Sequence, residues 1–321
     1  MPMNRRISLG IAAALVCVAA AAHADAPGDA WAAAKALLPG TPYVVLGVNL
    51  ATVKGSTIFQ QLYPTLIAQA GGAQEGLDKV KTTCGIDVVS TVQGAVVAVD
   101  ESQKGAIFLS TKGLDNSKVT DCLSKMVAKE KGVKTGVVAT KPDAQGIVEY
   151  TSEGETKKLY IAFLGKGVLV LATDAQDKTL LQSWLSGKGA GAGTATAKAL
   201  GSVNTGAAMW MVLTQEKDLA PQVNATMKVI YGHADLAAGN INADFRLVTA
   251  SAKQATDLAA FANKQVDDAK KGGQVPPQAM SVMKTLKIAQ TGDEVQLKAS
   301  IPEKEALSLV GGALGGGGGG Q

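Results

Sequence analysis

Two apolar segments joined by a short polar turn constrain the fold of this chain most strongly. The segments are QGAVVAVD (93–100) and KGAIFLST (104–111), and the turn lies around residues 101–104. Strands that are joined by so short a turn pair antiparallel. The same pattern recurs around residues 165–167, between KKLYIAFL and VLVLATD, and around residues 291–293, between TLKIAQ and EVQLKAS. We therefore expect antiparallel hairpins in both halves of the chain.

Helical segments alternate with these hairpins. Apolar residues recur at helical spacing in residues 117–130 and in residues 251–271, and Ser251 with Gln254 forms a capping box for the second helix. The segment INADFRLVT (241–249) alternates apolar and polar residues, which is typical of a strand with one buried face. The residues expected to face the core are Ile241, Ala243, Phe245 and Leu247 in this strand, and Leu258, Phe261, Ala262, Val266 and Ala269 in the helix. The order strand, strand, helix predicts an α+β fold of two similar halves, each a mainly antiparallel sheet with helices packed on a face.

Composition divides the chain into five parts. These are a signal peptide (1–24), a first α+β domain (25–187), a Gly/Ala-rich link (188–206), a second α+β domain (207–310) and a Gly-rich tail (311–321). The link holds neither G-x-G-x-x-G nor G-x-x-x-x-G-K-[ST], so it is interpreted as flexible chain and not as a phosphate-binding loop. The tail has almost no side chains to bury and is expected to be disordered. An internal repeat is suggested because AAKALLPGTPYVVLGVNL and TAKALGSVNTGAAMWMVL open the two halves alike.

The first residues are typical of a secretory signal peptide. Two arginines (5–6) precede the apolar run Ile7–Ala22, and cleavage is expected between Ala24 and Asp25. The apolar run has 16 residues, fewer than the roughly 20 that span a bilayer, which disfavours an uncleaved anchor. Lipoprotein processing at Cys17 and twin-arginine export are further alternatives. We expect a periplasmic or extracellular mature protein with no transmembrane segment.

The mature composition argues against several classes of protein. Removing residues 1–24 from the 321 leaves 297 residues with one histidine, His233, and one arginine, Arg246. A Ser/His/Asp triad would need His233, but the chain has no G-x-S-x-G motif, and one histidine with two distant cysteines cannot supply a zinc site. The other basic residues are scattered lysines, and 29 basic against 27 acidic residues gives a net charge near +2, unlike the basic patches of nucleic-acid binders. We expect no catalytic residue, metal, cofactor or nucleic-acid partner.

Cys84 and Cys122 are the cysteines that remain after cleavage. In an oxidising compartment such a pair tends to form a disulfide. Cys122 shares the apolar face of its helix with Val119 and Met126, so it is expected to point toward a core. A nucleophilic or redox cysteine is the alternative, but it would need a neighbouring base or a C-x-x-C motif. The sequence predicts a structural disulfide between Cys84 and Cys122.

Three short motifs resemble those of penicillin-recognising enzymes. They are S-x-x-K at 281–284, S-x-N at 202–204 and K-T-G at 134–136. In that family the S-x-x-K motif comes first and K-T-G last, whereas here the order is reversed. An enzyme using Ser281 and Lys284 is therefore disfavoured.

Several segments resemble a group of uncharacterised secreted proteins of myxobacteria and their relatives. The segments are PGTPYVVLGVNLATVKGSTIFQQLYPTL, TTCGIDVVSTVQGAVV, KGAIFLSTKGLDNSKVTDCL, GKGVLVLATD and KIAQTGDEVQLKASIPEKEAL. The most specific element is Cys-Gly-Ile-Asp followed by a second cysteine in a helix. The resemblance implies a disulfide-linked envelope protein and brings no activity or ligand.

Two functional hypotheses follow. The first is a non-catalytic secreted or periplasmic protein that acts through surface contacts with an envelope or extracellular partner. The alternative is a carrier of an apolar or lipid-like ligand, because YIAFL, VLVLA and QGAVVAVD are apolar on both faces and their second face must be covered by a helix or a ligand.

Overall fold

The computed structural model of the chain groups it into two units by residue contacts. The first unit holds residues 1–55 and 63–192, and the second holds residues 56–62 and 193–321. The signal peptide, its cleavage point at Ala24 and Asp25, and the tail 311–321 lie outside the described residues. The structure describes residues 27–38, 42–132, 136–152, 155–165, 167–187, 195–219, 222–272 and 277–308.

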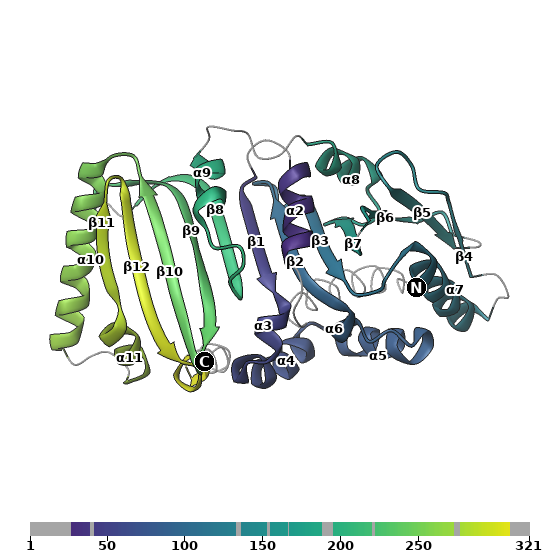
Figure 1. Cartoon of the computed structure of the whole chain (residues 1–321), viewed down its shortest axis with the longest axis horizontal. Helices are drawn as coiled ribbons and strands as arrows, with labels where there is room; N and C mark the ends of the chain where they lie inside the picture. The colour runs from purple at the N-terminus through teal and green to yellow at the C-terminus, as the bar shows by residue number, and fades with distance from the viewer. Residues whose placement is uncertain are drawn as a thin grey trace, which may run out of the picture. The chain divides into compact units, whose positions relative to one another are not determined.

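The first unit is built on a seven-stranded antiparallel sheet with the order β1-β2-β3-β7-β6-β5-β4 (Figure 1). Side chains of the central strands are buried at nearly every position, because these strands are apolar on both faces. The strands are β1 (Val44–Asn49), β2 (Val92–Val99), β3 (Gly105–Thr111), β4 (Val137–Ala139), β5 (Ile147–Ser152), β6 (Lys158–Phe163) and β7 (Val168–Ala172).

Helices pack on this sheet, and capping residues define where one of them, α7 (Asn116–Lys131), begins and ends. The helix α7 begins where Asp115 accepts a hydrogen bond from the Lys118 amide, and it ends at Gly132 with φ 66°. The helix α2 contacts β2 and β3, and α8 contacts β7 and β3. The helices of the first unit are α2 (Pro27–Leu37), α3 (Leu50–Lys54), α4 (Thr57–Gln69), α5 (Ala73–Cys84), α6 (Val88–Thr91), α7 (Asn116–Lys131) and α8 (Lys178–Leu185). The first residues of α4, up to residue 62, belong to the second unit.

The second unit is built on a five-stranded antiparallel sheet with the order β11-β12-β10-β9-β8. The helix α9 contacts β8 and β9, whereas α10 contacts β11, β12 and β10 (Figure 1). The elements are α9 (Ala195–Ser202), β8 (Met209–Asp218), β9 (Thr226–Ala237), β10 (Asn240–Thr249), α10 (Ala252–Gly272), α11 (Pro277–Thr285), β11 (Lys287–Thr291) and β12 (Glu294–Pro302), and residues 303–308 are helical.

The two units share part of their order of elements, which agrees with the predicted α+β fold of two similar antiparallel halves, although the first has seven strands and the second five. Each begins with a helix, α2 or α9, followed by a meander of three strands. A helix then follows, α7 or α10, and the last strand of each unit pairs with the third strand of the meander: β7 with β3, and β12 with β10. The segments that echo each other in the sequence lie at the start of the two units.

The structure differs from several of the sequence-based expectations. The predicted link 188–206 is too long at its carboxyl end, because residues 195–202 form α9 and bury Thr196, Ala199 and Leu200. The structure adds a strand, β9, to those expected from the sequence. The faces predicted to be buried on β10 and α10 are only partly buried, and the buried residues of α10 are Ala255 and Ala259.

Tyr150 links the sheet of the first unit to α7. Its hydroxyl donates a hydrogen bond to Asn116 Oδ1 at 2.6 Å, and burial raises the pKa of this phenol to about 12 from an ordinary value of 10.0. Because the folded state holds the proton more tightly than the unfolded state, this contribution to stability is complete below pH 10 and is lost as the pH rises toward 12.

We expect Tyr150→Phe to abolish that alkaline loss. At neutral pH the variant should be less stable by about 1 kcal/mol, because the Asn116 acceptor loses its donor. Between pH 10 and 12 the wild-type protein should lose stability faster than the variant, so that their free energies of unfolding converge. Chemical denaturation at a series of pH values measures both curves, and parallel curves would contradict this account.

Candidate functional site

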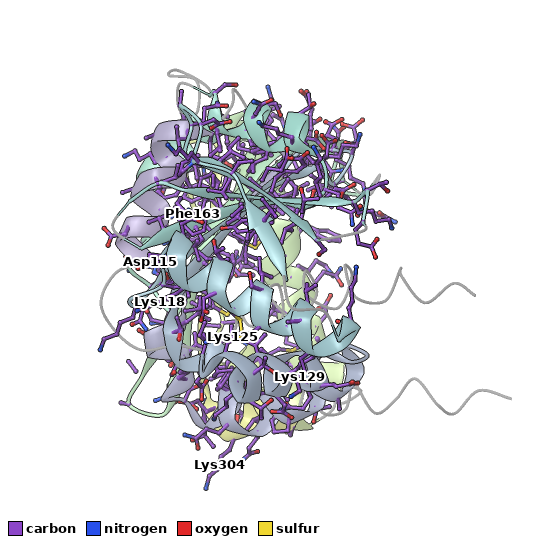
Figure 2. The ribbon with its side chains drawn as sticks, turned by 90° about the vertical axis from the view of Figure 1, so that its right-hand side faces the viewer. Asp115, Lys118, Lys125, Lys129, Phe163 and Lys304 are labelled. Atoms are coloured by element: carbon purple, nitrogen blue, oxygen red, sulfur yellow. A yellow bond between two sulfur atoms is a disulfide. The ribbon has the colours of Figure 1, made fainter. Side chains whose placement is uncertain are left out.

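The disulfide predicted from the sequence is present in the first unit. Cys84 and Cys122 are joined with their Cα atoms 5.0 Å apart. Cys84 is the last residue of α5, which ends because Gly85 adopts a φ of 69°, and Cys122 is buried on α7. Lysines lie along the same helix, as the labels in Figure 2 show for Lys118, Lys125 and Lys129. The bridge therefore fastens α5 to α7, and it is a structural feature.

The serine-enzyme motifs are spread over different elements. Ser281 and Lys284 belong to α11, where Lys284 is exposed, and Ser202 is the exposed last residue of α9. Lys134 and Thr135 lie outside the described residues. The Ser202 hydroxyl donates a hydrogen bond to the Lys198 carbonyl at 2.8 Å.

A polar cluster on the second unit contains Arg246 and His233, the only arginine and the only histidine among the described residues. Arg246 lies opposite Tyr231 in the β9–β10 pairing, and His233 lies opposite Asp244. Arg246 Nη1 is 3.3 Å from Glu294 Oε2, and its guanidinium carbon is 5.9 Å from the centre of the Tyr231 ring. Sequence pattern does not indicate this cluster, because its members are distant in the chain and meet only through the pairing of β9, β10 and β12.

Internal partners satisfy the charges of this polar cluster. The Tyr231 hydroxyl donates to the Glu294 carboxylate at 3.0 Å, and Lys198 from α9 lies 3.7 Å from the same carboxylate, whose side chain is 14% exposed. Asp244 accepts a hydrogen bond from Gln296 Nε2 at 2.8 Å. Burial, followed by the hydrogen bond to Glu294, raises the pKa of Tyr231, so this phenol stays a donor at neutral pH. The cluster ties α9 to the sheet and is compensated in charge.

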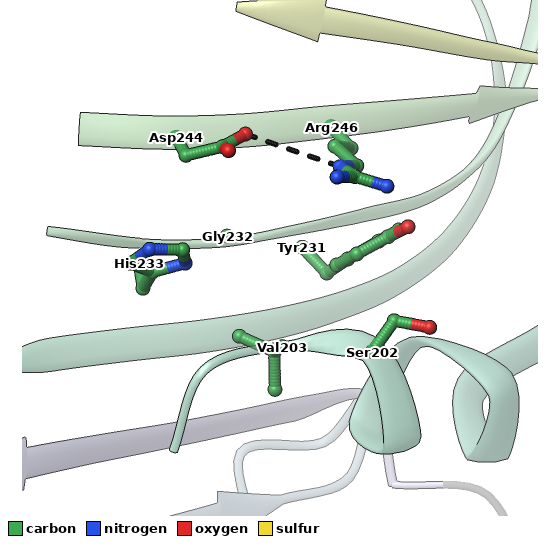
Figure 3. A pocket seen from close by; sticks show the side chains of 7 residues that line it. All are labelled: Ser202, Val203, Tyr231, Gly232, His233, Asp244 and Arg246. Atoms are coloured by element: carbon green, nitrogen blue, oxygen red, sulfur yellow. Dashed lines mark ion pairs between the residues drawn. The ribbon is translucent and has the colours of Figure 1, made fainter. Parts of the chain in front are cut away.

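The small pocket beside this cluster is too narrow for an organic substrate. It encloses about 30 Å³, enough for water. Figure 3 shows Ser202 and His233 at opposite ends of the pocket, with Val203 between them. His233 Nε2 is 4.0 Å from Asp235 Oδ2, so its closest acidic neighbour is at the limit of an ion pair. This geometry does not assemble a nucleophile with a base.

The described parts of the chain contain neither a metal-binding cluster nor a membrane-spanning helix. Those residues hold no group of three or more His, Cys, Asp or Glu side chains that could bind a metal ion. Among the same residues, no helix is both long and apolar enough to span a bilayer.

The opposite face of the second sheet carries apolar side chains that are not fully buried. Strand pairing brings Met211, Gly232 and Phe245 into one row and Leu213 and Ile230 into the next. The exposed fraction of the side chain is 2% at Val295, beneath α10, and 45% at Met209 on β8. We call six residues of this surface the open apolar face: Met209, Met211, Leu213, Ile230, Leu236 and Phe245, of which all but Met209 are partly buried.

The open apolar face exists because the helices cover different parts of the sheet. Lys198 and Val203, from α9 and the residue after it, approach the face that carries Tyr231 and Arg246. Leu258 of α10 packs with Val295 on the other face, over β11 and β12. As a result, β8 and β9 are well covered on the α9 side, where Trp210, Val212 and Tyr231 are buried, and less well covered on the other side.

Gly232 keeps the middle of the open apolar face flat. A Cβ atom at this position would lie 2.5 Å from Phe245 Cδ1 and 2.5 Å from the Asp244 carbonyl oxygen. The Phe245 ring therefore lies across the glycine of the neighbouring strand. This contact is a packing reason for a glycine within β9.

We expect Gly232→Ala to destabilise the second unit by about 1–3 kcal/mol, because the added methyl group overlaps with backbone as well as with a ring. The matched control is Gly201→Ala in α9, where an added Cβ meets nothing within 4 Å. That change should leave stability unchanged or raise it by up to about 1 kcal/mol. Denaturation followed by the fluorescence of Trp210, with the other two tryptophans replaced by phenylalanine, measures both. Equal effects of the two substitutions would contradict the packing of Phe245 on Gly232.

Comparisons with known proteins place the chain in no family. No family model and no curated protein matches it. Three solved structures that resemble it are crystal forms I, III and IV of TP0453, with sequence identities of 12%, 11% and 13% and TM-scores of 0.45, 0.46 and 0.47. Each comparison covers 86% of this chain and 95% or 96% of the other. The resemblance to secreted myxobacterial proteins receives no support from these comparisons.

Proposed function

We propose that this protein is a non-catalytic component of the cell envelope that acts through contacts on the open apolar face of its second unit. The observation that carries the proposal is the 45% exposure of Met209, beside partly buried apolar side chains, on a sheet face that the sequence pattern assigns to a core. Exposed apolar patches on a folded domain commonly mark interaction sites. The signal peptide predicted from residues 1–24 supports an envelope or extracellular location.

The polar features of the chain favour binding over catalysis. The polar cluster around Arg246 is compensated by Asp244 and Glu294, and the pocket beside it has room only for water. Of the three strands that suggested an apolar carrier from the sequence, β2 and β7 are buried at nearly every position and β6 is partly buried, so β2 and β7 offer little surface to a ligand. The open apolar face of β8 and β9 is the better candidate for contact.

Site-specific photocrosslinking tests this function. A photoreactive amino acid replaces Met209 in the full chain, produced with its leader in its own host, and a control chain carries it at Lys253, an exposed position of α10. We expect adducts in the envelope fraction from position 209 and few from position 253. Equal yields from both positions, or no adduct from position 209, would overturn the proposal.

A further inference from the structure

The end strand of the second sheet, β11, is a second place where this protein can contact a partner. It pairs with β12 over its whole length, from Lys287 to Thr291, without a shift in register (Figure 1). Among the described residues, no strand pairs with its other side. One long side of β11 is therefore an edge of the sheet.

The hydrogen bonds of β12 show which way the backbone groups of β11 point. The Asp293 carbonyl accepts a hydrogen bond from the Thr249 amide at 2.9 Å, so it points toward β10. Backbone direction alternates along a strand, so the odd-numbered residues of β12 bond to β10 and the even-numbered residues bond to β11. The residues of β11 opposite the even-numbered ones are Lys287, Ala289 and Thr291, and their backbone groups point inward.

Ile288 and Gln290 therefore direct their backbone groups away from the sheet. Within the described part of the chain, no hydrogen bond reaches the amide or the carbonyl of either residue. Two donors and two acceptors thus lie along the edge of a strand that has neither a proline nor a bulge. Such an edge is a template for the addition of another strand.

The end strand of the first sheet, β4, is closed by comparison. It has three residues, and α7 approaches it closely. The Ser124 hydroxyl of α7 donates a hydrogen bond to the Val137 carbonyl at 3.4 Å, and a Cβ atom at Gly136 would lie 2.1 Å from the Ser124 carbonyl oxygen. In the second unit, α10 packs instead on a face of β11, where Leu258 and Ile288 join the cluster around Val295. This packing uses the Ile288 side chain and not its backbone groups.

A second copy of β11 is complementary to this edge. When two β11 strands pair antiparallel about a two-fold axis at Ala289, Ile288 of each copy lies opposite Gln290 of the other. These are the residues with outward groups, so every donor meets an acceptor. Lys287 of each copy then lies opposite Thr291 of the other, which avoids a pair of like charges.

We propose that the protein forms a two-fold dimer in which the β11 strands of two copies pair antiparallel about Ala289. The dimer joins the second sheets of the two copies into one. It uses the edge of β11 and not the open apolar face on β8, β9 and β10, so it stands independently of the proposed function. An extended segment of a different protein is the other occupant that the experiment distinguishes.

Ala289→Cys in the mature chain tests the register of this dimer. Ala289 is exposed, and at the axis it lies opposite its own copy in a non-hydrogen-bonded pair, where Cα atoms are about 4.5 Å apart. A disulfide can form over this distance. Cys84 and Cys122 are already joined to each other, so the introduced cysteine is the free thiol of the mature chain. We expect a mild oxidant to convert most of this variant to a covalent dimer on a non-reducing gel.

Lys287→Cys is the matched control for the covalent dimer. Lys287 is exposed on the same side of the same strand, but it lies two residues from the axis. Its copy in the dimer lies four residues along the strand, roughly 14 Å away, which is too far for a disulfide. This variant should remain a covalent monomer. Equal yields of covalent dimer from the two variants would indicate random collision and overturn the inference.

Gln290→Pro tests the hydrogen bonds of the edge by sedimentation equilibrium. Proline removes the outward amide of Gln290 and leaves the inward ladder to β12 intact, so association should weaken by about tenfold or more while the chain stays folded. Ala289→Pro, which removes an inward amide, should instead lower the stability of the second unit. A wild-type chain that sediments as a monomer would overturn the inference, as would a dimer that Gln290→Pro does not weaken. A monomeric wild-type chain whose Ala289→Cys variant crosslinks to a different protein in the envelope would assign the edge to that protein.

Discussion

Replacing Cys84 and Cys122 together with alanine is expected to lower the free energy of unfolding of the first unit by about 4 kcal/mol. The two cysteines are separated by 38 positions, and a cross-link over a loop of this size removes that much conformational entropy from the unfolded chain. The loss is large because the net stability of a domain is only about 5–15 kcal/mol.

Denaturation followed by tryptophan fluorescence measures this change. Replacing Trp210 with phenylalanine leaves Trp31 and Trp184, which lie in the first unit, so that the signal reports this unit alone. A reducing agent should lower the free energy of unfolding of the protein that keeps both cysteines to that of the double variant. It should leave the stability of the double variant unchanged. Equal stability of the oxidised and reduced protein would show that the bridge does not fasten α5 to α7 in solution.

Phe108→Ala is expected to cost about 3–5 kcal/mol in the first unit. Phe108 is fully buried on β3, and it lies opposite Val96 on β2 and Val170 on β7, both of which are also fully buried. Truncation loses the transfer free energy of the ring and leaves a cavity that surrounding strands cannot close.

Val138→Ala is the matched control for this substitution. Val138 lies on the edge strand β4 and is 68% exposed, so its truncation should change stability by less than about 0.5 kcal/mol. The same fluorescence measurement applies to both variants. A cost for Phe108→Ala that is no larger than that of Val138→Ala would contradict the burial of β3 in the core of the first unit.

Much of the fold could be predicted from local pattern. The hairpin of β2 and β3 follows from two apolar runs around a short turn, and the bounds of α7 follow from Asp115 and Gly132. The disulfide could be predicted because two cysteines remain in a chain that is expected to be secreted. For the hairpin and the helix, the sequence signal and the structural cause lie within the same few residues.

The candidate site could not be predicted in the same way, because it depends on how elements distant in sequence cover one another. The alternation of Ile241, Ala243 and Phe245 indicates an apolar face, but not whether a helix covers it. Coverage is decided by the placement of α10 over β11 and β12, and of α9 on the other face. The polar cluster likewise needs Glu294 on β12 beside Arg246 on β10, a pairing fixed only by the strand order.

Methionine footprinting tests the central claim, that the open apolar face is covered by an occupant in the cell envelope. Mild oxidation converts exposed methionine to its sulfoxide, and Met209 is 45% exposed whereas Met126 is 9% exposed. In the purified, delipidated wild-type protein, Met209 should oxidise rapidly and Met126 slowly. In the isolated envelope, the account predicts that Met209 becomes protected while Met126 is unchanged. Oxidation of Met209 at the same rate in both preparations would contradict it.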